Sequence, residues 1–587
     1  MNAPPLERWT EAAGFLLSLP RRALEAAQRV PPWWLGSIPV AVVAVLTAMA
    51  YDPRVYPGGD NALYWALGRS LAETLEYRDL GAPGAPFETS IPWGFPLLIA
   101  GGMLVLPDGY PYLKIVSWLS MAGAFACLWG FLRHQLPESR GVMLLAVLLL
   151  AVNHRLLVFA SLLLTEAPFL LFSMAALLAF EVYRRRWAER WWGVAPSMAL
   201  ASYGYLVRPA GVALVAALLG FLVLSRRWKA TAVALGVVVL LAGSWHVRSV
   251  LVPSDSENLY LSYLVKRSKY QTDEAKVGAA DLVARVSHNA QAYARSPLHR
   301  LTVGTKWKDR TRLSPVVLPM LAMIAVGFFF SLRRPGPVHL YVPLYLAVIL
   351  LWLPESVKTR YLAMLFPLLL PLALYGLHRL VGQRWPSVAA WAVLLAFLFM
   401  GYFHGVRISR KVDSYTEVRR SYRAGDHEVR QRRSYRSYVQ MCEWLRDNAP
   451  DDVILAARKP RLAYLYSGHQ AVRVTFETDP AEVYPWLVDN EIDYVLLDRL
   501  DSQVEDTRIR MLATQLEYSE HFADLFSSFL GDRVARFSPD ADEIAAHRAE
   551  KAAYQRKLLH KRGREDDPAA PDEAGAADDT EDDGGEE

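Results

Sequence analysis

Two acidic residues stand where the sequence predicts that helices begin. Asp60 follows a Gly-Gly pair and opens an amphipathic pattern in YPGGDNALYWALGRSLAE, and Glu166 opens a long apolar run in LLLTEAPFLLF. Either carboxylate could serve its helix alone, because Asp is a favoured N-cap residue and an acid near a helix N-terminus interacts favourably with the helix dipole. A positioned carboxylate can also act as a general base toward a hydroxyl group. The residues alone leave both interpretations open.

Four basic residues lie near the ends of apolar runs. Arg208 precedes Pro209 at a break between two runs, Arg248 lies near the end of one run, and Lys358 and Arg360 precede another. Their simplest role is to reach from a helix end to the water interface. Arg can also bind two phosphate oxygens with its planar guanidinium group, whereas Lys offers a point charge. These four residues are therefore candidate phosphate ligands.

The elements that must position these residues are apolar runs typical of a multi-pass membrane protein. The chain has 587 residues, of which 53% are hydrophobic, and its mean hydropathy is +0.13. A run of roughly 17–25 apolar residues is long enough to cross a bilayer as a helix. We expect about eleven spans by this criterion, close to residues 33–51, 110–132, 141–160, 164–183, 191–207, 209–225, 230–252, 314–332, 337–353, 361–380 and 386–404. The run 91–107 is broken by Pro and Gly and is expected to form a short interfacial helix.

The charges of the short loops predict the orientation of the spans. Five of these loops together carry 13 Arg or Lys and only the acids Glu138 and Glu189, and such loops tend to face the cytoplasm. The long loops 52–109 and 253–312 then lie on the outer side of the cell (inner) membrane, as does the C-terminal part. Ten Arg or Lys between residues 407 and 436 favour the opposite side for that part, but the five short loops agree with one another.

The chain outside the spans divides into four further segments. Residues 1–32 read as an amphipathic helix lying on the membrane, and 405–433 as a basic linker. Residues 434–547 alternate helical and strand patterns, with the strands VILAA, AVRVTF and DYVLL, and predict a small α/β domain. Residues 548–587 are basic and then strongly acidic, a composition typical of disorder.

Several other classes of site find no support in the sequence. It contains no Walker loop, no GxSxG motif and no HExxH motif. His154, His246 and His404 stand apart without metal-ligand spacing and are interpreted as structural. The two cysteines, Cys127 and Cys442, are not expected to form a disulfide. The small net charge of +5 gives no indication of nucleic-acid binding.

The order of the motifs between about residues 35 and 404 resembles that of the GT-C glycosyltransferases. Within them it is most similar to the bacterial protein O-mannosyltransferase and aminoarabinose-transferase-like branch. The resemblance rests on these segments in this order: GGDNALYWALGRSLAE, SIPWGFPLLIAG, TEAPFLLF, VRPAG, SWHVRSVL and TRYLAMLFPLLLP.

The resemblance implies a polytopic helical fold and a sugar donor linked to polyprenyl phosphate. It also implies inversion at the anomeric carbon and an acceptor that is a lipid, a glycan or a protein. Asp60 would be the general base and Glu166 a second acid that orients the acceptor or assists the base. The donor phosphate would be bound by residues from the basic set, namely Arg208, Arg360, Lys358 and Arg248.

One position departs from the family pattern. Many members have a second acid directly after the first-loop Asp, where this chain has Asn61. Because hard divalent ions prefer several oxygen ligands, we expect no metal or other cofactor.

The main alternative to a transferase is a transporter or lipid flippase. Many transporters have repeated halves and polar groups near the middle of the membrane. The sequence shows no such repeat, and its charged residues gather near the outer ends of the runs. A non-catalytic scaffold would leave this gathering of charges unexplained.

Overall fold

The computed structural model describes residues 5–252, 277–307, 309, 312–354, 357–500, 507–542, 545 and 549. It forms two compact units. The first unit consists of Met1–Asp79 and Pro86–Val429, and the second of Leu80–Ala85 and Arg430–Glu587.

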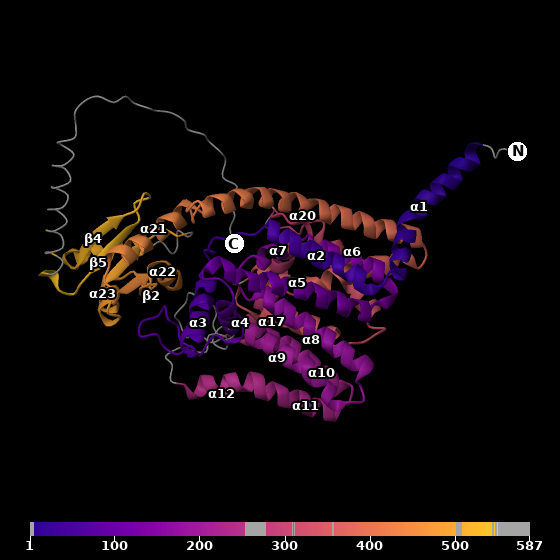
Figure 1. Cartoon of the computed structure of the whole chain (residues 1–587), viewed down its shortest axis with the longest axis horizontal. Helices are drawn as coiled ribbons and strands as arrows, with labels where there is room; N and C mark the ends of the chain where they lie inside the picture. The colour runs from indigo at the N-terminus through magenta and orange to yellow at the C-terminus, as the bar shows by residue number, and fades with distance from the viewer. Residues whose placement is uncertain are drawn as a thin grey trace. The chain divides into compact units, whose positions relative to one another are not determined.

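The described part of the first unit is helical, as the apolar runs predict (Figure 1). A π-helical turn, Val239–Gly243, joins α11 to α12, and a second, Ala294–Leu298, joins α14 to α15. The helices are α1 (Pro5–Arg29), α2 (Pro32–Met49), α3 (Asp60–Thr74), α4 (Gly94–Val105), α5 (Tyr110–Gln135), α6 (Arg140–Ala151), α7 (His154–Ala160), α8 (Glu166–Arg186), α9 (Ala195–Val207), α10 (Val212–Leu224), α11 (Trp228–Val238), α12 (Ser244–Leu251), α14 (Ala279–Tyr293), α15 (His299–Val303), α16 (Val317–Ser331), α17 (Val338–Leu351), α18 (Thr359–Ala363), α19 (Phe366–Gly382) and α20 (Pro386–Arg423).

A helix is found at each of the predicted spans. Among the described residues, five helical segments are long and apolar enough to cross a membrane: α2, α5, α8, Trp228–Leu251 and α20. Five further apolar helices are shorter, at 10–17 residues: α4, Pro209–Leu224, α16, α17 and α19. These helices confirm a multi-pass membrane protein, whereas the number of crossings remains a prediction.

The run predicted as one span at 141–160 is two helices. Pro137–Ala151 and His154–Ala160 are bent by 61° at a short break. The break coincides with Asn153, whose side-chain oxygen accepts hydrogen bonds from the N–H groups of Arg155 and Leu156. An N-cap of this kind starts a new helix, so the apolar run does not continue straight.

Close helix packing in the first unit depends on glycine. A Cβ atom at Gly327 of α16 would lie 1.8 Å from the carbonyl oxygen of Leu372 in α19, and one at Gly376 would lie 2.3 Å from that of Met323. Small residues allow the backbones of membrane helices to approach in this way. Gly94 brings α4 equally close to the end of α9, because a Cβ there would lie 2.5 Å from the carbonyl carbon of Leu206.

The last helix of the first unit is longer than predicted. α20 runs without interruption from Pro386 to Arg423, so it passes the expected boundary at residue 404 and includes most of the expected basic linker. Arg419 donates hydrogen bonds to the carbonyls of Met49 (2.7 Å) and Tyr51 (3.0 Å), which follow α2. At least one cationic residue of the expected linker therefore makes hydrogen bonds within the folded first unit.

The second unit contains a five-stranded sheet in the order β2-β1-β3-β5-β4. The predicted strands are confirmed as β1 (Ile454–Ala457), β2 (Gln470–Arg473) and β3 (Tyr494–Leu497), which pair in parallel. The hairpin of β4 (Phe522–Ser527) and β5 (Arg533–Phe537) is antiparallel and was missed, because polar residues interrupt its apolar pattern. The helices of this unit are α21 (Arg433–Asn448), α22 (Pro460–Ser467), α23 (Pro480–Asp489) and α24 (Thr507–Glu517).

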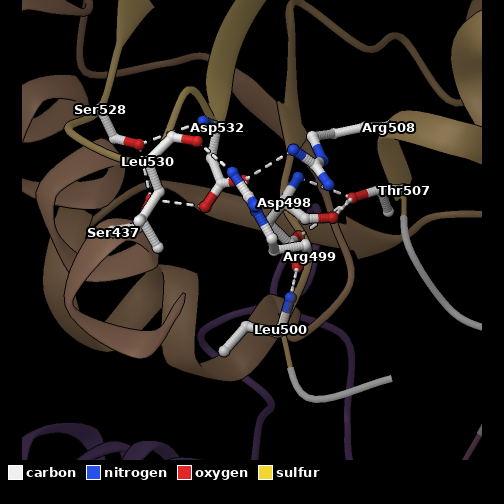
Figure 2. Close-up of polar contacts among 9 residues, drawn as sticks. All are labelled: Ser437, Asp498, Arg499, Leu500, Thr507, Arg508, Ser528, Leu530 and Asp532. Atoms are coloured by element: carbon white, nitrogen blue, oxygen red, sulfur yellow. Dashed lines mark hydrogen bonds and ion pairs between the residues drawn. The ribbon is translucent and has the colours of Figure 1, made fainter. Parts of the chain in front are cut away.

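Two buried carboxylates lie beside the paired ends of the neighbouring strands β3 and β5 (Figure 2). Asp532 accepts a hydrogen bond from the Ser437 hydroxyl and pairs with Arg499 Nε at 3.1 Å. Asp498 directly follows β3 and accepts hydrogen bonds from Leu500 N–H and the Thr507 hydroxyl. Burial raises the pKa of Asp498 to about 6, although both hydrogen bonds oppose the increase.

This pKa predicts that the second unit is stabilised by mild acid. The pKa of Asp498 is higher than its ordinary value of 3.8, so the folded state binds the proton more tightly than the unfolded chain does. The corresponding stability is full below pH 3.8 and is lost as the pH rises through about 6. Thermal unfolding of wild type and Asp498→Asn at pH 5 and pH 7.5 checks this. The wild type should lose more stability between the two values than the variant, and equal losses would contradict the prediction.

Candidate active site

Asp60 is the first residue of α3, but it does not cap that helix. The N-cap position is Gly59, whose φ of +93° is readily adopted by glycine, and no side chain bonds to the first turn. The Asp60 carboxylate instead faces Arg360, with 3.0 Å between Oδ2 and Nη1. The Asp60 side chain is 50% exposed. Of the two roles that the sequence left open, the structure thus disfavours the cap.

Glu166 is the first residue of α8 and is fully enclosed. Its Oε1 atom lies 2.9 Å from Arg208 Nη1 and 2.8 Å from Arg360 Nε, while its side chain has no exposed surface. The second oxygen, Oε2, has no hydrogen-bond partner among the described residues. Glu166 therefore connects two guanidinium groups and keeps one acceptor position open.

The backbone around Arg208 explains how this side chain is directed. Arg208 ends α9 in an extended conformation, with φ −151° and ψ 121°, as expected for a residue before proline. Its side chain is 7% exposed and also donates to the Thr165 hydroxyl at 3.3 Å. Gly94 supports the same region, because α4 packs on the backbone that precedes Arg208.

Tyr361 organises the two arginines. Its ring lies 5.0 Å from Arg208 Cζ and 5.7 Å from Arg360 Cζ. An aromatic face attracts guanidinium groups and so stabilises two like charges near each other. Tyr345 holds this segment through a hydrogen bond of 3.0 Å from its hydroxyl group to the Tyr361 carbonyl.

These side chains form one connected cluster, which we call the Asp60–Glu166 cluster: Asp60, Glu166, Arg208 and Arg360. Burial decreases in the order Glu166, Arg208, Arg360, Asp60, from no exposed surface to 50%. The two acids and two arginines balance in charge. Asp60 is thus the acidic side chain of the cluster that can meet a molecule from solution, and Arg360 is the adjacent cation.

Two of the predicted phosphate ligands do not contact this cluster. Lys358 is exposed, and no contact between its side chain and the four residues is found. Arg248 binds the carbonyl oxygens of Glu88 (2.7 Å) and Tyr77 (3.4 Å) instead. Asn61, the position of the family's second acid, is buried and donates to the Tyr110 hydroxyl at 2.8 Å.

The sequence analysis gave no role in the site to three residues that support it: Thr165, Tyr361 and Lys114. The buried Lys114 Nζ donates to the carbonyl oxygens of Asp52 (2.7 Å) and Arg54 (2.5 Å) in the loop that leads to Asp60. A lysine inside an apolar helix was the available signal for this role, because such a charge must find partners.

The interpretation of the histidines as isolated was wrong. His154 and His404 are buried, and their Nδ1 atoms lie 3.0 Å apart. Among the residues that the structure describes, no group of three or more His, Cys, Asp or Glu is arranged to hold a metal ion. The histidine pair therefore joins α7 to α20 without a site for a metal.

A protein-family model matches part of the chain. Residues 90–246, which include Glu166 and Arg208, match the family model described as dolichyl-phosphate-mannose-protein mannosyltransferase. No curated protein matches the chain by sequence.

Solved structures show the same fold. ArnT from Cupriavidus metallidurans has a TM-score of 0.52 and 12% identity, over 85% of this chain and 97% of that chain in the apo state. Its structure with undecaprenyl phosphate gives the same values over 87% and 99%. The Archaeoglobus fulgidus oligosaccharyltransferase, tethered with an acceptor peptide, has a TM-score of 0.51 and 10% identity over 86% and 74%.

At such identities the structural similarity shows the fold, and this fold is that of the GT-C glycosyltransferases. The resemblance found in the sequence motifs is confirmed. The matched family is one of glycosyltransferases, so the predicted enzyme class is confirmed with it.

Proposed function

We propose that the chain transfers a sugar from a polyprenyl-phosphate donor to a hydroxyl acceptor at the outer face of the membrane, with Asp60 as general base. The observation that carries this proposal is the Asp60–Glu166 cluster. It joins a half-exposed carboxylate to a guanidinium group at 3.0 Å, which are the two groups that such a transfer requires. The polyprenyl donor is supported by the ArnT structure, which binds undecaprenyl phosphate.

The reaction uses these two groups together. The acceptor oxygen attacks the anomeric carbon from the side opposite the phosphate and inverts that centre. Asp60 takes the hydroxyl proton, and the bond between the anomeric carbon and the phosphate oxygen breaks. Arg360 stabilises the charge on the departing polyprenyl phosphate by charge-assisted hydrogen bonds.

Arg360 also couples donor binding to the base. Its guanidinium group pairs with Asp60 at 3.0 Å and with Glu166 at 2.8 Å. A donor phosphate competes with Asp60 for Nη1, while Nε stays with Glu166. Donor binding thus releases the Asp60 carboxylate for the acceptor.

Glu166 and Arg208 are the more deeply buried residues of the cluster, and they hold Arg360 in position. Arg208 is more deeply buried than Arg360, at 7% against 20% exposed, so we assign it to holding Glu166 rather than to direct phosphate binding. Glu166 fixes the Nε side of Arg360, and because its side chain has no exposed surface we assign it to assisting the base through Arg360 rather than to direct contact with the acceptor. The remaining candidates, Lys358 and Arg248, have no role in this step.

Substitution of Arg360 should raise the KM for the sugar donor. Removing a charge-assisted contact costs about 1.5–3 kcal/mol, so the donor KM of Arg360→Ala should rise by about 10–150-fold. Arg360→Lys should recover part of this, because Lys keeps the charge and lacks the planar fork. Steady-state transfer at varied donor concentration is the measurement. An unchanged donor KM in Arg360→Ala would exclude this residue as the phosphate ligand.

The outer location of the second unit is a separate prediction. Arg54, in the first outer loop, donates to the Val429 carbonyl at 2.7 Å. This contact supports a location of the end of the first unit on the same side as that loop. Leu80–Ala85 of the same loop belongs to the second unit. A reporter that is active only in the cytoplasm, fused after Pro539, should therefore stay inactive. An active reporter would mean that the predicted number of eleven spans is wrong by an odd number.

The transporter alternative is not favoured by any observation. The cluster lies at the ends of α3, α8, α9 and α18, and both the matched family and the archaeal neighbour are named as transferases.

A further inference from the structure

A hollow in the first unit is lined by none of the four residues of the Asp60–Glu166 cluster. It has a volume of about 480 Å³ and opens between the end of α3, the start of α4 and the end of α12. Most of its lining is apolar or aromatic, and Arg248 provides a cationic group. We call it the Arg248 groove. The side chains used in the argument are Leu71, Leu75, Tyr77, Trp93, Leu97 and Arg248.

Arg248 is held by backbone carbonyls and aromatic rings, and no carboxylate oxygen of the described residues lies within ion-pair distance of it, although the Glu88 carboxylate is near enough to interact electrostatically. It donates to the carbonyl oxygens of Glu88 and Tyr77, and its Cζ lies 5.4 Å from the Tyr77 ring and 5.6 Å from the Trp245 ring. Arg has five N–H donors, and these two contacts use two of them. Its remaining donors and its charge are available to an anion.

The acidic residue in the lining does not cancel this charge. Glu76 forms an ion pair with Arg78, with 2.5 Å between Oε2 and Nε. The Glu88 carboxylate, which interacts with Arg248 from beyond ion-pair distance, accepts hydrogen bonds from the N–H groups of Ser90 and Ile91. The positive charge of Arg248 is therefore compensated only in part, which favours an anionic ligand.

The apolar surface around Arg248 indicates that this ligand is a lipid. Arg248 lies in the last turn of the apolar segment Trp228–Leu251, where a membrane helix meets the headgroup region. Val250 and Leu251, beside it, are 84% and 74% exposed. In the groove itself, Leu75 is 89% exposed and Leu97 43%. Exposed apolar side chains next to a fixed cation suit a molecule that joins a hydrocarbon chain to a phosphate.

The position of the groove separates it from the proposed donor phosphate. Both sites use α3, but Asp60 is its first residue and Leu71 lies near its end. At 1.5 Å per residue, these positions are roughly 16 Å apart along the helix. One phosphate group cannot contact Arg360 at one end and Arg248 at the other.

We infer that the Arg248 groove binds the phosphate headgroup of a second lipid, distinct from the sugar donor. Its phosphate bonds to the free donors of Arg248, and its hydrocarbon chain covers Leu71, Leu75 and Leu97. This site goes beyond the proposed transfer reaction, and its distinction from the donor site rests on the proposed binding of the donor phosphate by Arg360.

The test measures binding of a defined probe to the full chain in detergent. The probe is dioctanoyl phosphatidic acid, with dioctanoyl phosphatidylcholine and inorganic phosphate as comparisons, and bound probe is counted by native mass spectrometry. Arg248→Gln should weaken binding of phosphatidic acid by about tenfold or more, because a charge-assisted contact is lost. The matched control is Arg227→Gln, at the other end of the same apolar segment, where Arg227 bonds the Ala188 carbonyl.

A second variant tests the apolar wall without disturbing the fold. Leu75 has a φ of +59° and is the C-cap residue of α3. Asn accepts this left-handed conformation more readily than Leu does, so Leu75→Asn should leave stability intact and still weaken binding of phosphatidic acid. Binding of inorganic phosphate should not respond to this substitution.

The outcomes separate this site from the donor site. Weaker phosphatidic acid binding in Arg248→Gln, with an unchanged donor KM, supports the inference. Equal binding in Arg248→Gln and wild type overturns it, as does competition by inorganic phosphate at the same concentration as the lipid. A rise in donor KM in Arg248→Gln, similar to that in Arg360→Ala, would assign the groove to the donor and overturn it too. Absence of transfer activity in the wild type would contradict the proposed function but not the binding result.

Discussion

Asp60→Asn should lower sugar transfer by a factor of about 10²–10⁴, the usual contribution of a positioned general base. The substitution keeps the size and the polar character of the side chain and removes its ability to accept the proton. It should leave α3 intact, because the N-cap is Gly59 and Asp60 makes no cap hydrogen bond. Asp60 is half exposed and Arg360 keeps its contact with Glu166, so loss of this ion pair should change stability little. Transfer from a polyprenyl-phosphate sugar by the purified protein is the measurement, with thermal stability recorded in parallel.

The matched control for Asp60→Asn is Glu73→Gln on the same helix. Glu73 pairs with Arg69 at 2.7 Å and is 52% exposed, close to the exposure of Asp60. Both variants lose one exposed carboxylate of an ion pair on α3, and the base is removed in Asp60→Asn alone. Transfer at the wild-type rate by Asp60→Asn would contradict the mechanism. An equal decrease in both variants would show that the loss reflects charge on α3 rather than proton transfer.

The helices of the first unit could be predicted because their apolar character is local. Apolar runs such as those of α5 and α8 can be recognised from their length and composition alone. The acids could be found for a similar reason, because a carboxylate at the start of an apolar run is conspicuous. The three strands that precede the hairpin were also recognisable from short β-branched and aliphatic segments.

The pairing within the cluster could not be predicted. Asp60 and Arg360 are separated by 300 positions in the chain, and Glu166 and Arg208 come from different helices. Their contacts depend on how the helices pack, for instance on Gly94 holding α4 against the end of α9. Composition cannot distinguish Arg208, which joins Glu166, from Arg248, which binds backbone carbonyls elsewhere.

Two errors in the predicted boundaries have local physical causes. Asn153 caps a new helix within an apolar run and so produces the 61° bend. Charged residues after residue 404 suggested a linker, but Arg and Glu are good helix formers. α20 therefore continues to Arg423, and Arg419 is used to bind the loop after α2.

Glu166→Gln should give a large loss of stability together with a loss of transfer. Glu166 has no exposed surface and compensates Arg208, which is 7% exposed, as well as one side of Arg360. Removing one partner of a buried ion pair leaves an uncompensated charge and costs about 3–5 kcal/mol. Transfer should decrease as well, because Arg360 loses the contact at its Nε atom that orients it toward the donor phosphate.

The double variant Glu166→Gln with Arg208→Gln distinguishes this electrostatic explanation from simple loss of packing. It removes one negative and one positive charge, while Arg360 keeps Asp60 as a partner. The double variant should therefore be destabilised by less than the sum of the two single variants, with a coupling of about 0.5–3 kcal/mol. Thermal or denaturant unfolding in one detergent gives the stabilities, and additive effects would contradict the electrostatic explanation.

Glu181→Gln is the matched control for the effect of Glu166→Gln on transfer. Glu181 lies toward the other end of the same helix, is buried, and pairs with Arg185 Nε at 2.7 Å and Arg184 Nη1 at 3.2 Å. Its arginine partners are 44% and 27% exposed, so water can compensate them and the loss of stability should be smaller than in Glu166→Gln. Transfer should stay close to the wild-type rate, because this pair lies outside the Asp60–Glu166 cluster. If Glu181→Gln impaired transfer as strongly as Glu166→Gln does, the activity loss would follow from destabilised α8 and not from the orientation of Arg360.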